Sequence, residues 1–172
     1  GGNDEEWFLK MNPNGTVPVW QEGDFTLYES HAIIRYLAQQ KPGLYGTNAR
    51  ESALVDCWLD WFALTFWPPV RVLFVEVWRE KTLARDSDRA RAAHHEVEAN
   101  LIALATRLES AGHIALPEFS LADIVFASGL NRLKGLDFGI AAPDTVNAWR
   151  AQQSNSPGLV HATAAEPDMP GH

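Results

Sequence analysis

Residues 8–38, FLKMNPNGTVPVWQEGDFTLYESHAIIRYLA, decide the fold of the N-terminal part of this chain. Two short β-prone runs, residues 17–20 and 25–28, flank the polar, glycine-containing segment 21–24, which predicts a hairpin with a four-residue loop. In residues 30–38 the apolar side chains recur at helical spacing, so a helix should follow the hairpin. One hairpin with one helix does not make a stable sheet domain, so we expect upstream residues or another chain to complete the sheet.

The residues after this stretch show only helical patterns. Residues 42–49 contain one proline and two glycines, and they predict a linker between a partial N-terminal domain, residues 1–41, and an all-helical domain, residues 50–160. Residues 161–172 lack periodicity, and we expect a coil tail there. Within the helical domain, apolar spacing predicts helices over residues 50–67, 70–83, 89–108, 120–134 and 145–153.

Composition and charge exclude several classes of protein. The chain has 172 residues, a formal net charge of −8 and 46% hydrophobic residues, which is enough apolar material for a core. Its single cysteine excludes a disulfide scaffold and a cysteine-based zinc site within the chain. The acidic balance argues against nucleic acid as a partner, and the longest uncharged apolar run, residues 61–70, reaches only about half a bilayer span. The chain opens on Gly1-Gly2 without an initiator methionine, so we expect it to be incomplete.

Two dipeptides in the opening stretch carry the clearest chemistry. Spacing alone favours a trans bond at Val17-Pro18, since cis bonds are about 5–6% of such bonds, but a cis bond would turn the backbone of Val17 toward an extended peptide-like ligand. Ser30 opens a helix, where free amides attract a carboxylate, and Glu29 can accept from an ammonium group. Together they suit the head group of an α-amino acid. The alternative, which spacing alone favours, is that Ser30 only caps the helix while Glu29 complements its dipole.

The opening stretch resembles the second half of the N-terminal domain of bacterial-type glutathione transferases. Residues 119–124, FSLADI, resemble the second hallmark of that family, the N-terminal capping box of a buried helix, with Ser120 and Asp123 in structural roles. The resemblance implies the ββα half of a thioredoxin-like α/β domain followed by an all-α domain. It also implies that the first βαβ unit, with the residue that activates the glutathione sulfur, lies upstream, so the catalytic residue is unknown.

The resemblance further implies how glutathione would be held. Val17 would pair with its cysteinyl part through the backbone, Pro18 would be the cis-proline, and Glu29 with Ser30 would hold the γ-glutamyl head. Thr16 would contact the glycyl end.

The implied reaction is the conjugation of the glutathione thiolate to electrophilic small molecules, with glutathione as co-substrate and no metal. Trp61 and Phe66 are candidates for the electrophile pocket. The resemblance also implies a cytoplasmic homodimer that acts in detoxification, without nucleic acid or membrane partners. Two alternatives stay open: a non-catalytic or glutathione-binding assembly module of the same fold, and a helical interaction protein whose hairpin joins a partner's sheet.

The remaining candidate residues favour structural interpretations. Cys57 has apolar neighbours in the sequence and is expected to be an inert core thiol. His94 and His95 are adjacent, so they should point to different faces and not form a metal pair. Asp56 and Asp60, spaced i,i+4, are predicted to form a solvated or interface stripe rather than a metal or proton-transfer pair. His31 is expected to be an exposed helix residue.

Overall fold

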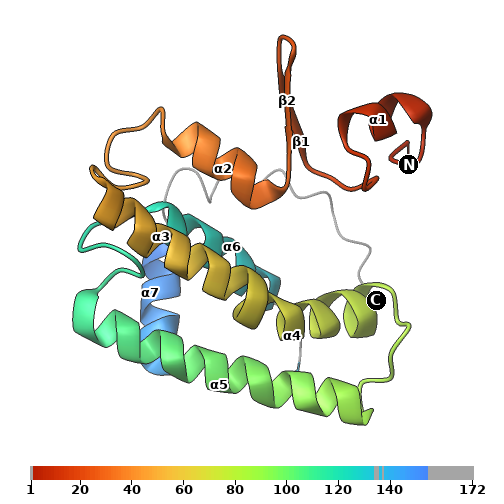
Figure 1. Ribbon diagram of the computed structural model, residues 1–172. Coiled ribbons are helices and arrows are strands. Elements are labelled where there is room, and N and C mark those ends of the chain that lie inside the picture. Colours follow the sequence, from red (N-terminus) through yellow and green to blue (C-terminus); the bar gives the residue numbers. More distant parts are fainter. Residues whose placement is uncertain (1, 134–135, 137, 155–172) are drawn as a thin grey trace.

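The computed structural model describes residues 2–133, 136 and 138–154 of the chain, and it divides them into a hairpin–helix unit and a helical bundle (Figure 1). None of the described helices combines the length and hydrophobicity needed to cross a bilayer. The N-terminal unit consists of α1 (Glu6–Met11), β1 (Val19–Glu22), β2 (Phe25–Tyr28) and α2 (Ser30–Ala38). The bundle consists of α3 (Ala49–Trp61), η1 (Phe62–Phe66), α4 (Trp67–Arg71), η2 (Val72–Arg79), α5 (Asp88–Ala111), α6 (Leu121–Leu133) and α7 (Asp144–Ser154).

The predicted hairpin forms, but its loop is shorter than expected. The strands pair antiparallel from Val19 opposite Tyr28 to Glu22 opposite Phe25, which leaves a two-residue loop instead of four residues. Gly23 at the first loop position has a φ of 58°, a value that glycine adopts without steric cost and that a tight turn requires. The hairpin projects away from the helical bundle, with α1 beside it (Figure 1).

One nearly continuous helical column runs from residue 49 to residue 79. Two separate helices were predicted over residues 50–67 and 70–83, but the helix continues through Pro68 and Pro69, flanked by the π-helical segments η1 and η2. Proline has no amide hydrogen, so carbonyls one turn earlier lose their donors. The carbonyl of Thr65 instead accepts from Asn100 Nδ2 of α5 at 3.1 Å. A side chain of the neighbouring helix thus replaces the missing backbone donor.

Helix α5 runs beneath this column, and α6 and α7 pack behind it (Figure 1). Ser87 caps the start of α5 by accepting from Ala90 N–H at 3.2 Å, and Gly112, with a φ of 73°, ends it. The predicted stripe of Leu101, Leu104 and Leu108 is buried in the core. The helical part of the chain is therefore one bundle with a continuous apolar interior.

Ion pairs and hydrogen bonds join the N-terminal unit to the bundle. Arg35 of α2 donates to Asp56 at 2.6 Å and to Asp60 at 3.1 Å, both on α3. Tyr45 also donates to Asp56, at 2.7 Å, and burial followed by this hydrogen bond raises the pKa of its phenol. The two aspartates form an interface stripe, as predicted. Since Arg35 lies on the helix that follows the hairpin, these contacts fix where that helix sits on α3.

Candidate functional site

The hairpin register brings the two sequence-predicted dipeptides to one place. Val19 pairs with Tyr28, so Val17-Pro18 just before β1 and Glu29-Ser30 just after β2 leave the hairpin at the same end. Val17 is 67% exposed, and Glu29 and Ser30 are exposed as well. The Val17-Pro18 peptide bond is cis. These residues form the hairpin-end site.

Asn12 holds the loop that leads into this site, and the sequence analysis missed it. Its side chain is fully buried; Nδ2 donates to the carbonyl of Thr16 at 2.7 Å and to its hydroxyl at 3.1 Å. Its Oδ1 accepts from Asn14 N–H at 3.0 Å. The run Asn-Pro-Asn-Gly at residues 12–15 predicts a loop. Only the burial of Asn12 shows that its side chain organises that loop.

Glu29 has an uncommon backbone conformation at the start of α2. Its φ is 70° and its ψ is 116°, a region that a residue with a Cβ rarely occupies. Glu29 is the N-cap of α2, and its side chain makes no capping bond, so the prediction that Ser30 is the cap is wrong by one position. Backbone outliers of this kind concentrate at functional sites, where surrounding structure enforces them. Glu29 is the strongest local indication of a ligand site at the hairpin end.

The first turn of α2 offers hydrogen-bond donors beside Glu29. Ile33 N–H already bonds to the carbonyl of Glu29 at 3.0 Å, whereas the amides before it precede the first i−4 acceptor. Those amides and the positive end of the helix dipole favour a carboxylate, while the Glu29 carboxylate favours an ammonium group. A zwitterionic amino-acid head group would satisfy both.

His31 is not the exposed helix residue that the sequence predicts. It is half-buried, and its ring lies 5.7 Å from that of Phe62 in the bundle. Burial, and then the nearby charge of Arg35, lower the pKa of its imidazole below 6.5. His31 therefore contributes an uncharged ring to the contact between α2 and the bundle.

The two candidates for an electrophile pocket differ in placement. Phe66 is completely buried against Phe62 and Phe126, because η1 turns it toward α6, so it belongs to the core rather than to a pocket wall. Trp61 is half-buried and stacks on Phe126 with ring centroids 5.7 Å apart. Of the two residues, only Trp61 reaches the surface.

A separate cavity of about 310 Å³ lies between α5, α6 and α7. Apolar side chains such as Leu101, Leu130 and Val146 line it, and no residue of the hairpin-end site does. Its polar lining residues, Asn147 and Arg150, both come from α7.

Comparisons with known proteins agree with this geometry. The family model described as "Glutathione S-transferase, N-terminal domain" matches residues 1–40. A theta class glutathione S-transferase from the citrus canker pathogen Xanthomonas axonopodis pv. citri, solved with glutathione bound, is 34% identical with a TM-score of 0.84. That match covers 94% of this chain and 78% of the other. The chain belongs to the glutathione S-transferase family.

Two other glutathione S-transferases match smaller parts of the chain. GstB of Escherichia coli (strain K12) is 29% identical over 163 residues, which are 92% of this chain and 78% of GstB. A glutathione S-transferase of Hyoscyamus muticus is 28% identical over 141 residues, 78% of this chain and 66% of that protein. The predicted fold class and the predicted enzyme family are thus confirmed.

The glutathione S-transferase fold here contains the predicted Ser120–Asp123 pair. Both residues are fully buried. Asp123 accepts from Ser120 N–H at 2.9 Å, as a capping box requires, but the Ser120 hydroxyl donates to Asp123 at 2.8 Å instead of accepting from its amide. Asp123 also accepts from Ile114 N–H at 3.1 Å, which ties the loop before α6 to the helix.

Three further predictions, on Cys57, on the two adjacent histidines and on the C-terminal tail, need correction or comment. Cys57 is exposed, not a core residue, because it lies on the face of α3 opposite Val55 and Leu59. His94 and His95 differ in side-chain exposure, 24% and 80%, as residues on different faces do, but their ring centroids are 5.8 Å apart and both approach Glu98. The predicted coil tail, residues 161–172, lies outside the described residues.

Proposed function

We propose that the hairpin-end site binds glutathione and that the protein conjugates it to electrophilic small molecules. The observation that carries this proposal is Glu29, which adopts a positive φ immediately before the open amides of α2. Glu29 would accept from the ammonium of the γ-glutamyl head, and Ser30 with the helix amides would receive its carboxylate. The membership of the chain in the family supports the assignment.

The rest of the tripeptide would run along the neighbouring backbone. Val17, exposed beside β1, would pair with the cysteinyl part as an added strand does, and Thr16, held by Asn12, would lie near the glycyl end. In the reaction the glutathione sulfur loses its proton and forms a bond to an electrophilic carbon, from which a leaving group departs with its electron pair or, in an addition, at which a π bond opens and takes up a proton. We assign no residue to receive that proton, and Trp61 is the candidate for contact with the electrophile.

A double-mutant cycle tests the role of Glu29. Calorimetry would measure the dissociation constant of glutathione, and of an analogue lacking the α-amino group, with the unaltered protein and with Glu29→Gln. A charge-assisted hydrogen bond is worth about 1.5–3 kcal/mol, so Glu29→Gln should weaken glutathione binding about tenfold or more. The analogue should be nearly insensitive to the substitution, because it lacks the group that Glu29 binds.

Asp24→Asn is the matched control, since it removes one carboxylate at the opposite end of the same hairpin. It should leave the dissociation constant unchanged. Equal losses for glutathione and the deaminated analogue would contradict the role of Glu29. A folded protein that does not bind glutathione would overturn the proposal and favour the assembly module.

We also propose a cytoplasmic homodimer. Trp7, Phe25 and Leu64 are large apolar side chains that the single chain leaves exposed, as residues of a subunit interface would be. Light scattering after size exclusion should give twice the mass of the chain, and a monomer at micromolar concentration would contradict this.

A further inference from the structure

His94, His95 and Glu98 on α5 place three metal-ligating atoms within 4.8 Å of one another. His94 Nδ1 lies 3.6 Å from Glu98 Oε2, and His95 Nδ1 lies 3.9 Å from the same oxygen. Ligands about 2.1 Å from a tetrahedral zinc ion are about 3.4 Å apart, so small side-chain rotations would complete the geometry. The spacing suits a site with two imidazoles and one carboxylate.

The outer contacts of these side chains orient them as metal ligands are usually oriented. His94 Nε2 lies 3.1 Å from the carbonyl of Phe138, which can only accept, so Nε2 carries the hydrogen. In the neutral ring Nδ1 then presents a lone pair to Glu98. The other oxygen of Glu98, Oε1, accepts from Ala141 N–H at 3.0 Å. Such hydrogen bonds from the far side of the ligands fix tautomer and orientation at metal sites.

Both histidines approach the same oxygen of Glu98. His94 Nδ1 and Glu98 Oε2 lie 3.6 Å apart, which is too long for a hydrogen bond but close to the spacing of two ligands on one metal ion. His95 adds a second imidazole beside the same carboxylate oxygen. The three groups together therefore suit a metal ion.

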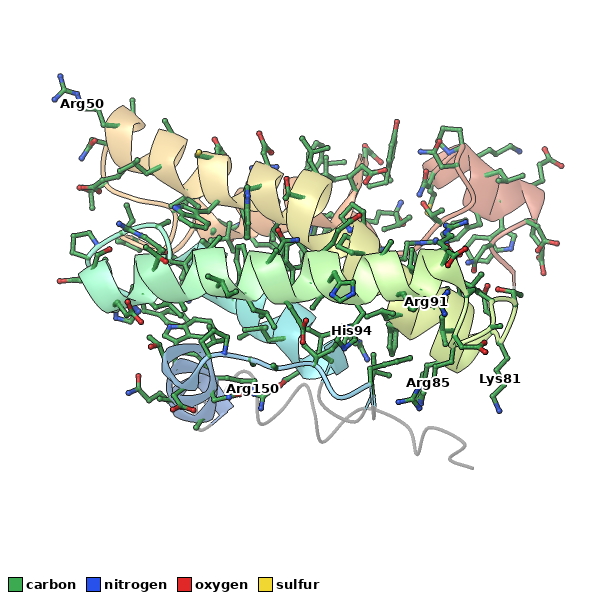
Figure 2. All side chains as sticks on the ribbon, turned by 90° about the horizontal axis from the view of Figure 1, so that it is seen from below. Arg50, Lys81, Arg85, Arg91, His94 and Arg150 are labelled. Carbon is green, nitrogen blue, oxygen red and sulfur yellow. The ribbon has the colours of Figure 1, made fainter. Side chains whose placement is uncertain are left out.

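The surroundings leave the site accessible. The side chain of His95 is 80% exposed, whereas those of His94 and Glu98 are about one quarter exposed. Figure 2 shows His94 on the side of α5 that faces the segment before α7, with Arg85 and Arg91 nearer the start of the helix. Arg91 is engaged with Asp88 and the carbonyl of Asp86.

We propose that His94, His95 and Glu98 bind a divalent first-row cation, Zn²⁺, with a water molecule in the fourth position. Imidazole and carboxylate ligands suit Zn²⁺, and the exposed side of His95 leaves room for the water. Since His94 and Glu98 are bonded to Phe138 and Ala141, the bound ion would fasten that segment to α5. The site lies in the helical bundle, so this inference is independent of glutathione binding.

Calorimetry with zinc chloride and protein without a histidine tag tests the proposal. We expect one Zn²⁺ per chain and a higher thermal unfolding midpoint with Zn²⁺ than with a chelator, because the ion binds the folded chain. Glu98→Gln should weaken binding at least tenfold. Glu96→Gln, with the same charge change at an exposed position two residues away, should have no effect.

His95→Ala keeps the test independent of folding, because this side chain is mostly exposed and its loss leaves the core unchanged. It should also weaken Zn²⁺ binding about tenfold. Binding should weaken at acid pH, since protons compete with the metal ion for its ligands. Zn²⁺ binding that is unchanged in both Glu98→Gln and His95→Ala would overturn the site. A protein that binds no Zn²⁺ at a concentration on the order of 100 micromolar, where weak sites fill, would overturn it as well.

Discussion

Asp123→Ala should destabilise the helical bundle strongly, because one buried carboxylate holds together the loop before α6 and the start of that helix. Three donors reach it: the amides of Ile114 and Ser120 and the hydroxyl of Ser120. Alanine removes the acceptor of all three while Ser120 and the site remain buried. Each buried donor left without a partner costs about 1–3 kcal/mol.

The three losses share one site, so they do not add fully, and we expect a total cost of about 3–5 kcal/mol. That is a large part of the roughly 5–15 kcal/mol by which folded domains are stable. Ser120→Ala removes only the hydroxyl donor and leaves the Ser120 amide bonded to Asp123, so it should cost about 1 kcal/mol. Asp123→Asn keeps the shape and one acceptor oxygen, and its cost should lie between the other two.

Urea denaturation followed by circular dichroism would measure these differences, with equal slopes for all variants if the unfolded states are alike. Asp144→Ala is the control, since it removes an exposed aspartate from the first turn of α7 and should cost less than about 1 kcal/mol. A cost of Asp123→Ala no larger than that of Ser120→Ala would refute the reasoning, because the two backbone bonds would then contribute nothing.

Two further substitutions test the packing of the bundle and of α2. Gly129→Ala should destabilise by about 1–3 kcal/mol, because a Cβ there would approach Phe62 Cε2 to 2.6 Å in a packed aromatic cluster; an unchanged denaturation midpoint would contradict this. The half-buried imidazole of His31 has a lowered pKa, so below pH 6.5 the unfolded chain binds this proton more readily than the folded chain does. The free energy of unfolding should therefore fall as the pH drops below 6.5, less steeply in His31→Asn than in the exposed control His95→Asn, both with chelator present. Identical slopes in the two variants would count against a lowered pKa of His31 in the folded chain.

The sequence predicted those features that depend on local periodicity. The apolar spacing of residues 30–38 predicts α2 at its observed bounds, and the Leu101, Leu104 and Leu108 stripe predicts α5 within three residues of its observed ends. Cys57 was misplaced because its apolar neighbours were counted without asking on which face each lies. At 100° per residue it points away from the buried pair Val55 and Leu59.

Other features depend on the tertiary structure. The π-helical segment η1 adds a residue to the turn, so a period of 3.6 cannot predict that Phe66 faces the core. His31 is half-buried only because Phe62, about thirty residues later, packs against it. The role of Asn12 depends on a burial that a run of loop-forming residues does not reveal.

The ion pairs of Arg35 with α3 fix one point of α2, so a small tilt of the helix about that point moves its N-terminal end. Arg35 lies five residues after Ser30, which is about 7.5 Å along the helix axis. A tilt of about 10° around the Arg35 contact would move the end that carries Ser30 by roughly 1.3 Å, and displacements of about 1 Å are enough to impair a reaction about a hundredfold. If the hairpin end binds glutathione as proposed, Asp56 and Asp60 on α3 would set how accurately it holds this ligand.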